Sequence, residues 1–361
     1  MRDKVIVQKV LQSQPMPSCL LNFAASPVGG GYKRLYEYAA EFNASGGASF
    51  VIHPAAKNLV AEFPRNRFFV VDQPRYQRLF NDCGYLADII KETGRPDLYY
   101  SYGIPIYNRV GRLNWFHLTN ALTLRTHGIP LSGSFRLKVM YLGWHVRRNL
   151  HNADVISAES RSSLELFDDV HAAKFFVSVN GSDDELASMK EPSCREPDNV
   201  ATAVGTYTYK ALDDSCRIFD MLRDGDNQLR LVIIGHEGDV PRSVRDHPGV
   251  VLAGELPRRD VIDRLKTSRY YISTTYVENS YNAASEGAFL AVESFISDIG
   301  PHRELLHDVP FDRIGIRGMN RPMLHVRRSD MSAANVKTWK DVVLEMMDRV
   351  YAVLPAADGK G

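Results

Sequence analysis

Residues 270–286, YYISTTYVENSYNAASE, contain the features that decide the fold. The first seven are mostly aromatic or β-branched and predict a buried strand, and the small residues from Tyr281 onward predict the start of a helix. Glu278 then lies in the loop after the strand, and Glu286 about one turn into the helix. Both carboxylates face the carboxyl edge of a sheet, where open α/β sheets bind ligands. Their spacing suits a ligand with two hydroxyl-bearing parts separated by phosphate, such as a sugar nucleotide.

Outward from this segment, short aromatic or β-branched runs alternate with amphipathic stretches along the whole chain. This alternation is typical of parallel sheets with crossover helices. The predicted strands of the first half are 19–25, 49–53, 67–71, 97–102, 113–118, 153–158 and 174–179. Those of the second half are 200–205, 229–235, 250–253, 270–275 and the region 291–297. We therefore expect an α/β protein with two doubly wound domains that face a cleft.

The chain of 361 residues is long enough for two domains of ordinary size. The charged, proline-containing stretch 185–199 has little apolar periodicity and predicts a linker. We expect the first domain over 1–184 and the second over 200–332. The tail, 333–361, begins with an amphipathic stretch over 333–353, and we expect this helix to cross back and brace the first domain.

The composition narrows the class of protein. Hydrophobic residues make up 44% of the chain, and 44 Lys and Arg nearly balance 43 Asp and Glu, which argues against a dedicated nucleic-acid binder. The four cysteines lack metal or redox spacing and indicate reduced thiols. No apolar stretch approaches the ~20 residues that span a bilayer, and the N-terminus does not resemble a secretory signal. We expect a cytoplasmic protein.

Two places in the first half could contact a ligand. Gly29, Gly30 and Gly31 lie between the first strand and a helix, where glycines allow a close backbone approach and the helix N-terminus favours negative charge. A tight strand-to-helix turn is the alternative interpretation. His117, at the end of a predicted strand, could hydrogen-bond a sugar hydroxyl or orient an acceptor. A packed structural histidine is equally compatible with the sequence.

In the second half, Gly205 keeps a strand-to-helix loop open, and Lys210 can provide a point charge for a diphosphate. A lone surface lysine is the alternative. Gly235 ends another strand, where backbone atoms could abut a nucleobase. Asp224-Gly225-Asp226 is interpreted as a turn between a helix and a strand, so we expect no metal site there.

The segment from Phe135 to Arg148 is basic, aromatic and amphipathic. Such a helix can rest on an anionic membrane surface. A solvated helix face is the more common explanation of this pattern, and the sequence leaves both open.

Together these residues resemble a retaining glycosyltransferase of family 4, a family with the GT-B fold. The resemblance covers most of the chain and rests on the order and spacing of its motifs. Besides the loops with Lys210 and Gly235 and the glutamate pair, the matching segments are 29–31, 153–160, 179–181 and 297–305.

The resemblance implies roles for these residues. Glu286 would accept hydrogen bonds from the ribose of a UDP- or GDP-sugar, and Glu278 would lie beside the donor sugar. Lys210 would neutralise charge on the leaving diphosphate, and His117 would hydrogen-bond the transferred sugar. The catalytic set would be His117, Lys210 and Glu278, with no protein nucleophile, metal or other cofactor. The remaining donor-binding positions would be Gly30, Gly31, Gly205, Thr206, Gly235, Asn279, Ser280, Tyr281 and Asn282.

Two departures from the family pattern concern the donor. Thr206 stands where members commonly have an arginine that binds phosphate, and Arg34 and Arg303 are candidates to replace it. Asn279 and Ser280 stand where the family often has Gly-Phe, so the sugar preference cannot be transferred.

The expected function is transfer of a hexose or deoxyhexose from a nucleoside-diphosphate sugar to a glycan or lipid-linked saccharide. Bacterial surface polysaccharide synthesis at the inner membrane face is the expected setting, with peripheral membrane contact. One alternative is a sugar-nucleotide 2-epimerase of the same fold. Another is a GT-B subunit that binds nucleotide or glycan without catalysis.

Overall fold

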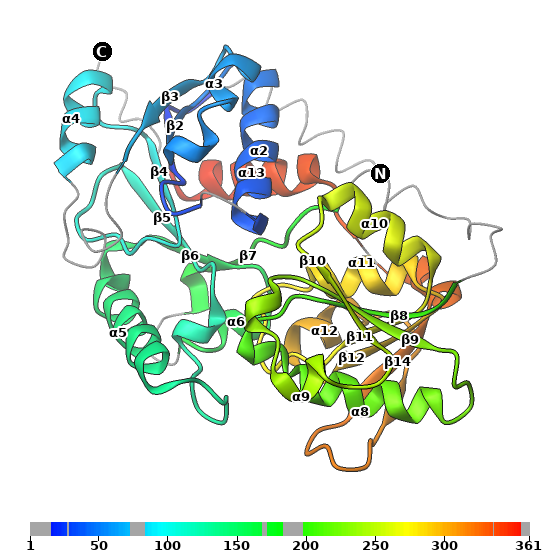
Figure 1. Ribbon diagram of the computed structural model, residues 1–361. Helices are drawn as coiled ribbons and strands as arrows, with labels where there is room; N and C mark the ends of the chain where they lie inside the picture. The colour runs from blue at the N-terminus through cyan, green and yellow to red at the C-terminus, as the bar shows by residue number, and fades with distance from the viewer. Residues whose placement is uncertain are drawn as a thin grey trace.

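The computed structural model describes residues 16–26, 29–72, 84–167, 172–182, 198–334 and 336–354, which form two seven-stranded sheets flanked by helices (Figure 1). Most of the predicted linker 185–199 lies outside the described residues, as do Cys83 and Cys194. Cys19 and Cys216 are buried free thiols.

The first sheet has the strand order β3-β2-β1-β4-β5-β6-β7, and every pairing is parallel. Its strands are β1 (Cys19–Asn22), β2 (Ser49–Ile52), β3 (Arg67–Val70), β4 (Leu98–Tyr102), β5 (Leu113–His117), β6 (Val155–Ala158) and β7 (Phe175–Val177). Each lies within a strand predicted from the sequence. Because β1, β4, β5 and β6 are buried along their whole length, both faces of this sheet must be covered.

Helices provide that cover. They are α2 (Gly29–Ala44), α3 (Leu59–Glu62), α4 (Gly84–Thr93), α5 (Gly133–Asn149) and α6 (Arg161–Leu164). One core contains Leu35 and Tyr38 of α2. The other contains Leu86 of α4 and Val146 of α5. The two cores make the first domain doubly wound, as predicted.

The second sheet has the order β10-β9-β8-β11-β12-β14-β13. Its strands are β8 (Asp198–Val204), β9 (Arg230–Ile234), β10 (Val250–Gly254), β11 (Ser268–Ser273), β12 (Glu293–Ser297), β13 (Asp312–Ile314) and β14 (Met323–Arg327). Its helices are α8 (Leu212–Arg223), α9 (Arg242–Arg245), α10 (Arg258–Thr267), α11 (Asn282–Leu290) and α12 (Gly300–Leu305). The sequence predicted parallel strands only, whereas β14 pairs antiparallel with β12 and with β13. The edge strand β13 was missed because it has three residues and no buried one.

The C-terminal helix α13 (Trp339–Val353) crosses back to the first domain, as predicted (Figure 1). It begins later than expected, at Trp339, and a separate 3-10 helix, Arg328–Ala333, precedes it. Thr338 caps it through a reciprocal hydrogen-bonded box with Asp341. Trp339, Met346 and Val350 are buried in the core beneath α2. No helix in the described ranges combines the length and apolarity needed to cross a bilayer.

Candidate functional site

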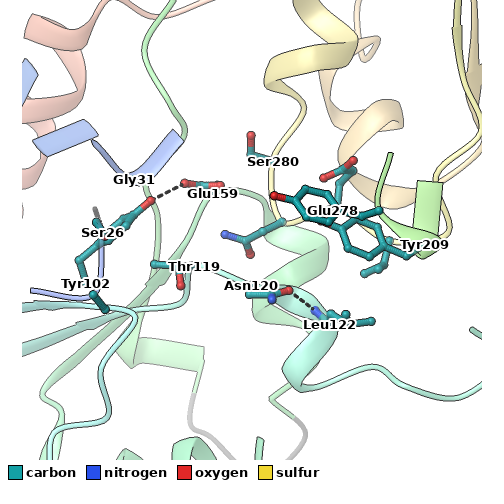
Figure 2. Close-up of a pocket in the computed structure, with 14 residues that line it drawn as sticks. Ser26, Gly31, Tyr102, Thr119, Asn120, Leu122, Glu159, Tyr209, Glu278 and Ser280 are labelled. Carbon is teal, nitrogen blue, oxygen red and sulfur yellow. Dashed lines mark hydrogen bonds between the residues drawn. The ribbon is translucent and has the colours of Figure 1, made fainter. Parts of the chain in front are cut away.

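A cavity of about 530 Å³ lies between the two sheets, at the carboxyl ends of their strands (Figure 2). Both domains contribute to its lining, as expected for two doubly wound sheets that face one another. The first-domain lining residues are Ala25, Ser26, Gly31, Tyr102, Thr119, Asn120, Leu122 and Glu159. The second-domain lining residues are Tyr207, Tyr209, Val277, Glu278, Asn279 and Ser280.

The second-domain wall brings Glu278 and Lys210 together. Glu278 follows β11, and Lys210 ends a 3-10 turn, Thr208–Lys210, that follows β8. The Lys210 Nζ lies 2.5 Å from the Glu278 Oε1. The two loops are hydrogen-bonded to each other. The Tyr276 N–H donates to the Tyr209 carbonyl at 2.8 Å, and the Thr274 hydroxyl donates to the Lys210 carbonyl at 2.9 Å. This ion pair, which the sequence did not predict, therefore has a rigid base at the sheet edge.

Gly205 and Gly235 lie directly beneath this wall. Both have positive φ, +91° and +149°. A Cβ on Gly205 would lie 3.1 Å from the Lys210 side chain, and one on Gly235 would lie 2.8 Å from the Thr206 methyl group. The glycines are thus required by close packing. Thr206 is buried against Gly235 and does not line the cavity.

The loop 278–280 is also bound to the first domain. The Asn279 Nδ2 donates to the Leu118 carbonyl at 2.8 Å, and the Asn180 Nδ2 donates to the Ser280 hydroxyl at 3.2 Å. The Ser280 hydroxyl also accepts from the backbone N–H of Asn282, at 3.1 Å, and so fixes the start of α11. Asn279 and Ser280 therefore form a hydrogen-bonded bridge across the back of the cavity.

Glu286 and Tyr281 lie outside the cavity lining. Glu286 accepts a hydrogen bond from the Arg258 guanidinium at 2.8 Å, and its side chain is mostly buried. Tyr281 packs against the second-domain core, and burial, followed by the charge of Glu304, raises its pKa to about 12. Arg258, the first residue of α10, orients Glu286 of α11 through this hydrogen bond. The sequence analysis did not single out Arg258.

On the opposite wall, the two predicted glycines differ. Gly31 lines the cavity, and a Cβ there would lie 2.8 Å from the Ser26 hydroxyl and 3.1 Å from the Tyr102 ring. Gly30 faces open space, with no atom within 4 Å of its Cβ position. Only Gly31 is required by close packing at the cavity.

Solved structures share this architecture. Anabaena HepE in complex with UDP-glucose matches with a TM-score of 0.53 at 14% identity, over 93% of this chain and 90% of that one. A glycosyltransferase from Rickettsia africae matches with a TM-score of 0.57 at 12% identity, over 94% and 89%. A Listeria monocytogenes protein assigned as a UDP-N-acetylglucosamine 2-epimerase matches with a TM-score of 0.52 at 10% identity, over 94% and 89%. The chain has the GT-B fold. No protein-family model and no curated protein sequence matches it.

Glu159 is a site residue of this GT-B protein that the sequence did not identify. It lies just after β6, is 6% exposed and lines the cavity from the first domain. Its Oε1 is 3.5 Å from the Tyr102 hydroxyl and 3.8 Å from Arg34 Nη2. Burial would raise the pKa of Glu159, but His117 and the charge of Arg34 outweigh burial and lower it. Its position at the carboxyl end of a strand was the available signal.

His117 ends β5, at the strand end where the sequence predicts it. It is fully buried, whereas Tyr102, stacked on its ring at 5.1 Å, lines the cavity. Its Nδ1 lies 2.8 Å from the Ser157 hydroxyl, and its Nε2 is 3.8 Å from the Glu159 Oε1. Burial, then the charge of Arg34, lowers the pKa of His117 to about 4, so the ring is neutral at pH 7. The structure thus matches the packed-histidine interpretation, with His117 supporting Tyr102 and Glu159 from behind the cavity wall.

Neither candidate for the missing phosphate arginine reaches the cavity. Arg34 is fully buried and donates to Asn180, Tyr38, Ser178 and the Val179 carbonyl. Arg303 pairs with Asp298 and does not line the cavity. Lys210 does not line the cavity either, but it is paired with Glu278, which does.

Two tyrosines that the sequence did not identify complete the second-domain wall. Tyr207 and Tyr209 stack with their ring centroids 5.5 Å apart and nearly parallel, at 9°. Tyr207 lines the cavity and is 60% exposed. An exposed aromatic face can stack on a nucleobase or on the apolar face of a sugar.

Proposed function

We propose that this protein is a retaining glycosyltransferase that uses a nucleoside-diphosphate sugar as its donor. The observation that carries the proposal is the ion pair of Lys210 and Glu278 at the wall of an interdomain cavity in a GT-B fold. The HepE structure, which shares this fold, was solved with UDP-glucose. The donor base, UDP or GDP, follows from the family resemblance.

In the proposed complex the donor lies along the second domain. Its diphosphate binds Lys210, which exchanges part of its pairing with Glu278 for the phosphate charge. Glu286, held by Arg258, accepts hydrogen bonds from the ribose, while Asn279 and Ser280 lie beside the sugar and the phosphates. Gly31 lets the first domain close on the donor without a side chain between them. His117 contributes by supporting Tyr102 and Glu159.

The proposed reaction breaks the bond from the anomeric carbon to the phosphate oxygen and forms a bond from that carbon to an acceptor oxygen. The acceptor proton passes to the leaving phosphate, so neither a protein nucleophile nor a metal is needed. Charge builds on the diphosphate as the bond breaks, and Lys210 stabilises it there. Removing one such group typically costs about 10²–10³ in kcat.

The acceptor in this proposal is a glycan or lipid-linked saccharide of bacterial surface polysaccharide synthesis. The enzyme would work at the cytoplasmic membrane face, in peripheral contact with it. Glu159 is the carboxylate of the first-domain wall, opposite Glu278, and is placed to hydrogen-bond an acceptor hydroxyl (Figure 2).

A 2-epimerase is the second candidate. Such an enzyme must remove a proton from the sugar ring, and Glu159 is a carboxylate on the wall opposite the donor side. Its lowered pKa weakens it as a base, which favours the transferase.

The test is incubation with UDP- and GDP-sugars, with and without saccharide acceptors, monitored by proton NMR. The transferase predicts acceptor-dependent release of nucleotide and an anomeric configuration that matches the donor. Glu286→Ala should abolish transfer while the fold is retained. Full activity of that variant would refute the site assignment, and an epimeric nucleotide sugar formed without acceptor would establish the epimerase instead. Nucleotide binding without turnover across a broad acceptor panel would favour the non-catalytic subunit.

A further inference from the structure

Helix α5 carries an apolar stripe that faces solvent. Leu137 is 69% exposed, Met140 51% and Trp144 49%, and Tyr141 is also exposed. Positions three and four apart share one face of a helix, so these four side chains form a single stripe. The opposite face, with Val139, Gly143 and Val146, is buried in the domain. The helix is thus apolar on its outward face as well as its inward one.

The same helix is basic along its exposed surface. Arg136, Lys138, Arg147 and Arg148 lie on it, and its sequence contains no acidic residue. Arg136, Lys138 and Arg148 make no ion pair with any described residue. The Arg148 guanidinium lies over the Trp144 ring, 5.0 Å from its centroid. Cations therefore border an exposed apolar stripe that includes a tryptophan and a tyrosine.

We propose that α5 is a membrane-docking helix that binds an anionic lipid surface. The apolar stripe would enter the boundary between headgroups and acyl chains, while the basic side chains contact lipid phosphates. Trp144 and Tyr141 suit that boundary because each combines an apolar ring with a polar group. A second copy of the chain fits less well, because pairing two such faces would oppose like charges.

The position of α5 connects the docking surface to the cavity. On its inner face Val139 packs in one cluster with Leu122 and Val277, and both of these residues line the cavity. Figure 1 shows α5 at the margin of the first domain. A bilayer bound at α5 would thus lie close to the acceptor side. This consequence, that the acceptor is presented from the membrane, rests on the proposed function, whereas lipid binding does not.

Trp144 provides a reporter for the test. The other two tryptophans, Trp115 and Trp339, are buried. The full chain is mixed with vesicles of phosphatidylcholine alone, or with a quarter of phosphatidylglycerol, and binding is followed by co-sedimentation and tryptophan emission. We expect binding to the anionic vesicles, with an emission blue shift that Trp144→Phe removes.

The variants separate the two halves of the surface. Leu137→Ser with Met140→Ser should remove the blue shift. Arg136→Glu with Arg148→Glu should weaken binding at least tenfold, since each neutralised charge near the surface accounts for about fivefold. The control is Arg242→Glu on α9, whose side chain is 93% exposed and which should bind as the wild type does. Circular dichroism verifies the fold of each variant.

The proposal is overturned if the wild type does not sediment with anionic vesicles, or if the α5 variants bind as tightly as the Arg242 control. It is equally overturned if Leu137→Ser with Met140→Ser dissolves a dimer in sedimentation velocity while vesicle binding is absent, because a second copy would then cover α5. Since no sugar nucleotide is present, failure here leaves the transferase proposal standing, and loss of transferase activity leaves vesicle binding intact.

Discussion

The strongest prediction on stability concerns Arg34→Met. The Arg34 guanidinium is fully buried and donates hydrogen bonds of 2.8–3.1 Å to Asn180, Tyr38, Ser178 and two backbone carbonyls. It also compensates the buried carboxylate of Glu159, 3.8 Å away. Methionine fills much of the volume but satisfies none of these groups, so Glu159 would keep an uncompensated charge.

Breaking a buried ion pair from one side costs about 3–5 kcal/mol. Each kcal/mol lowers the Tm of a domain of this size by roughly 2–4 °C, so Tm should fall by roughly 6–20 °C. Thermal unfolding followed by circular dichroism measures the change. The matched control is Arg242→Met, which removes a solvent-exposed guanidinium 3.1 Å from Asp246 and should change stability by less than about 1 kcal/mol.

A second substitution tests the cause. If the uncompensated charge of Glu159 dominates, then Glu159→Gln in the Arg34→Met background should recover part of the lost Tm, although Glu159→Gln alone destabilises the protein. The reasoning is refuted if Arg34→Met unfolds within about 1 °C of the Arg242→Met control. It is also refuted if the double variant is additive, because the charge would then play no part.

Three further predictions follow from the site. Gly31→Ala should weaken nucleotide-sugar binding in calorimetry, because its Cβ would meet Ser26 and Tyr102, while Gly30→Ala should bind normally; equal effects would contradict the packing argument. Lys210→Met should lower kcat by about 10²–10³, whereas a higher KM with an unchanged kcat would show that the lysine only binds the ground state. Between pH 6.5 and 4 the unfolded chain binds a proton that buried His117 excludes, so the free energy of unfolding should fall by roughly 3 kcal/mol as the pH drops through that window. In urea titrations His117→Gln should flatten that decrease and replacement of exposed His307 should not; an unchanged slope in His117→Gln would place its pKa near the ordinary value.

Much of the fold could be predicted from the sequence, because buried parallel strands are continuous apolar runs with recognisable ends. Strand β11 and helix α11 lie where the segment 270–286 predicts them. The meeting of Glu278 with Lys210 follows from the same logic, since the loops after β8 and β11 leave neighbouring strands at one sheet edge. Local pattern and a shared edge are sufficient to bring these loops together, although the sequence did not predict the ion pair itself.

Contacts across the domains could not be predicted in this way. The hydrogen bond from Asn279 to the Leu118 carbonyl joins positions 161 residues apart, and nothing in either local sequence indicates the other. The burial of His117 could not be predicted either, because a side chain at the end of a strand can be exposed or covered. Here Tyr102, at the end of the neighbouring strand β4, covers the His117 ring by stacking on it. For Glu159 the sequence offered only its position at the carboxyl end of a strand, which does not by itself indicate that the side chain lines a cavity.

Calorimetric titration with UDP and with GDP tests the central claim most directly, that a nucleoside diphosphate binds at the Lys210 and Glu286 side of the interdomain cavity. We predict saturable binding of one of the two, at one site per chain, that is lost in Glu286→Gln and strongly weakened in Lys210→Met. Arg242→Met should bind as the wild type does. Failure of both nucleotides to bind the folded wild type, or undiminished binding by the two site variants, would contradict the account.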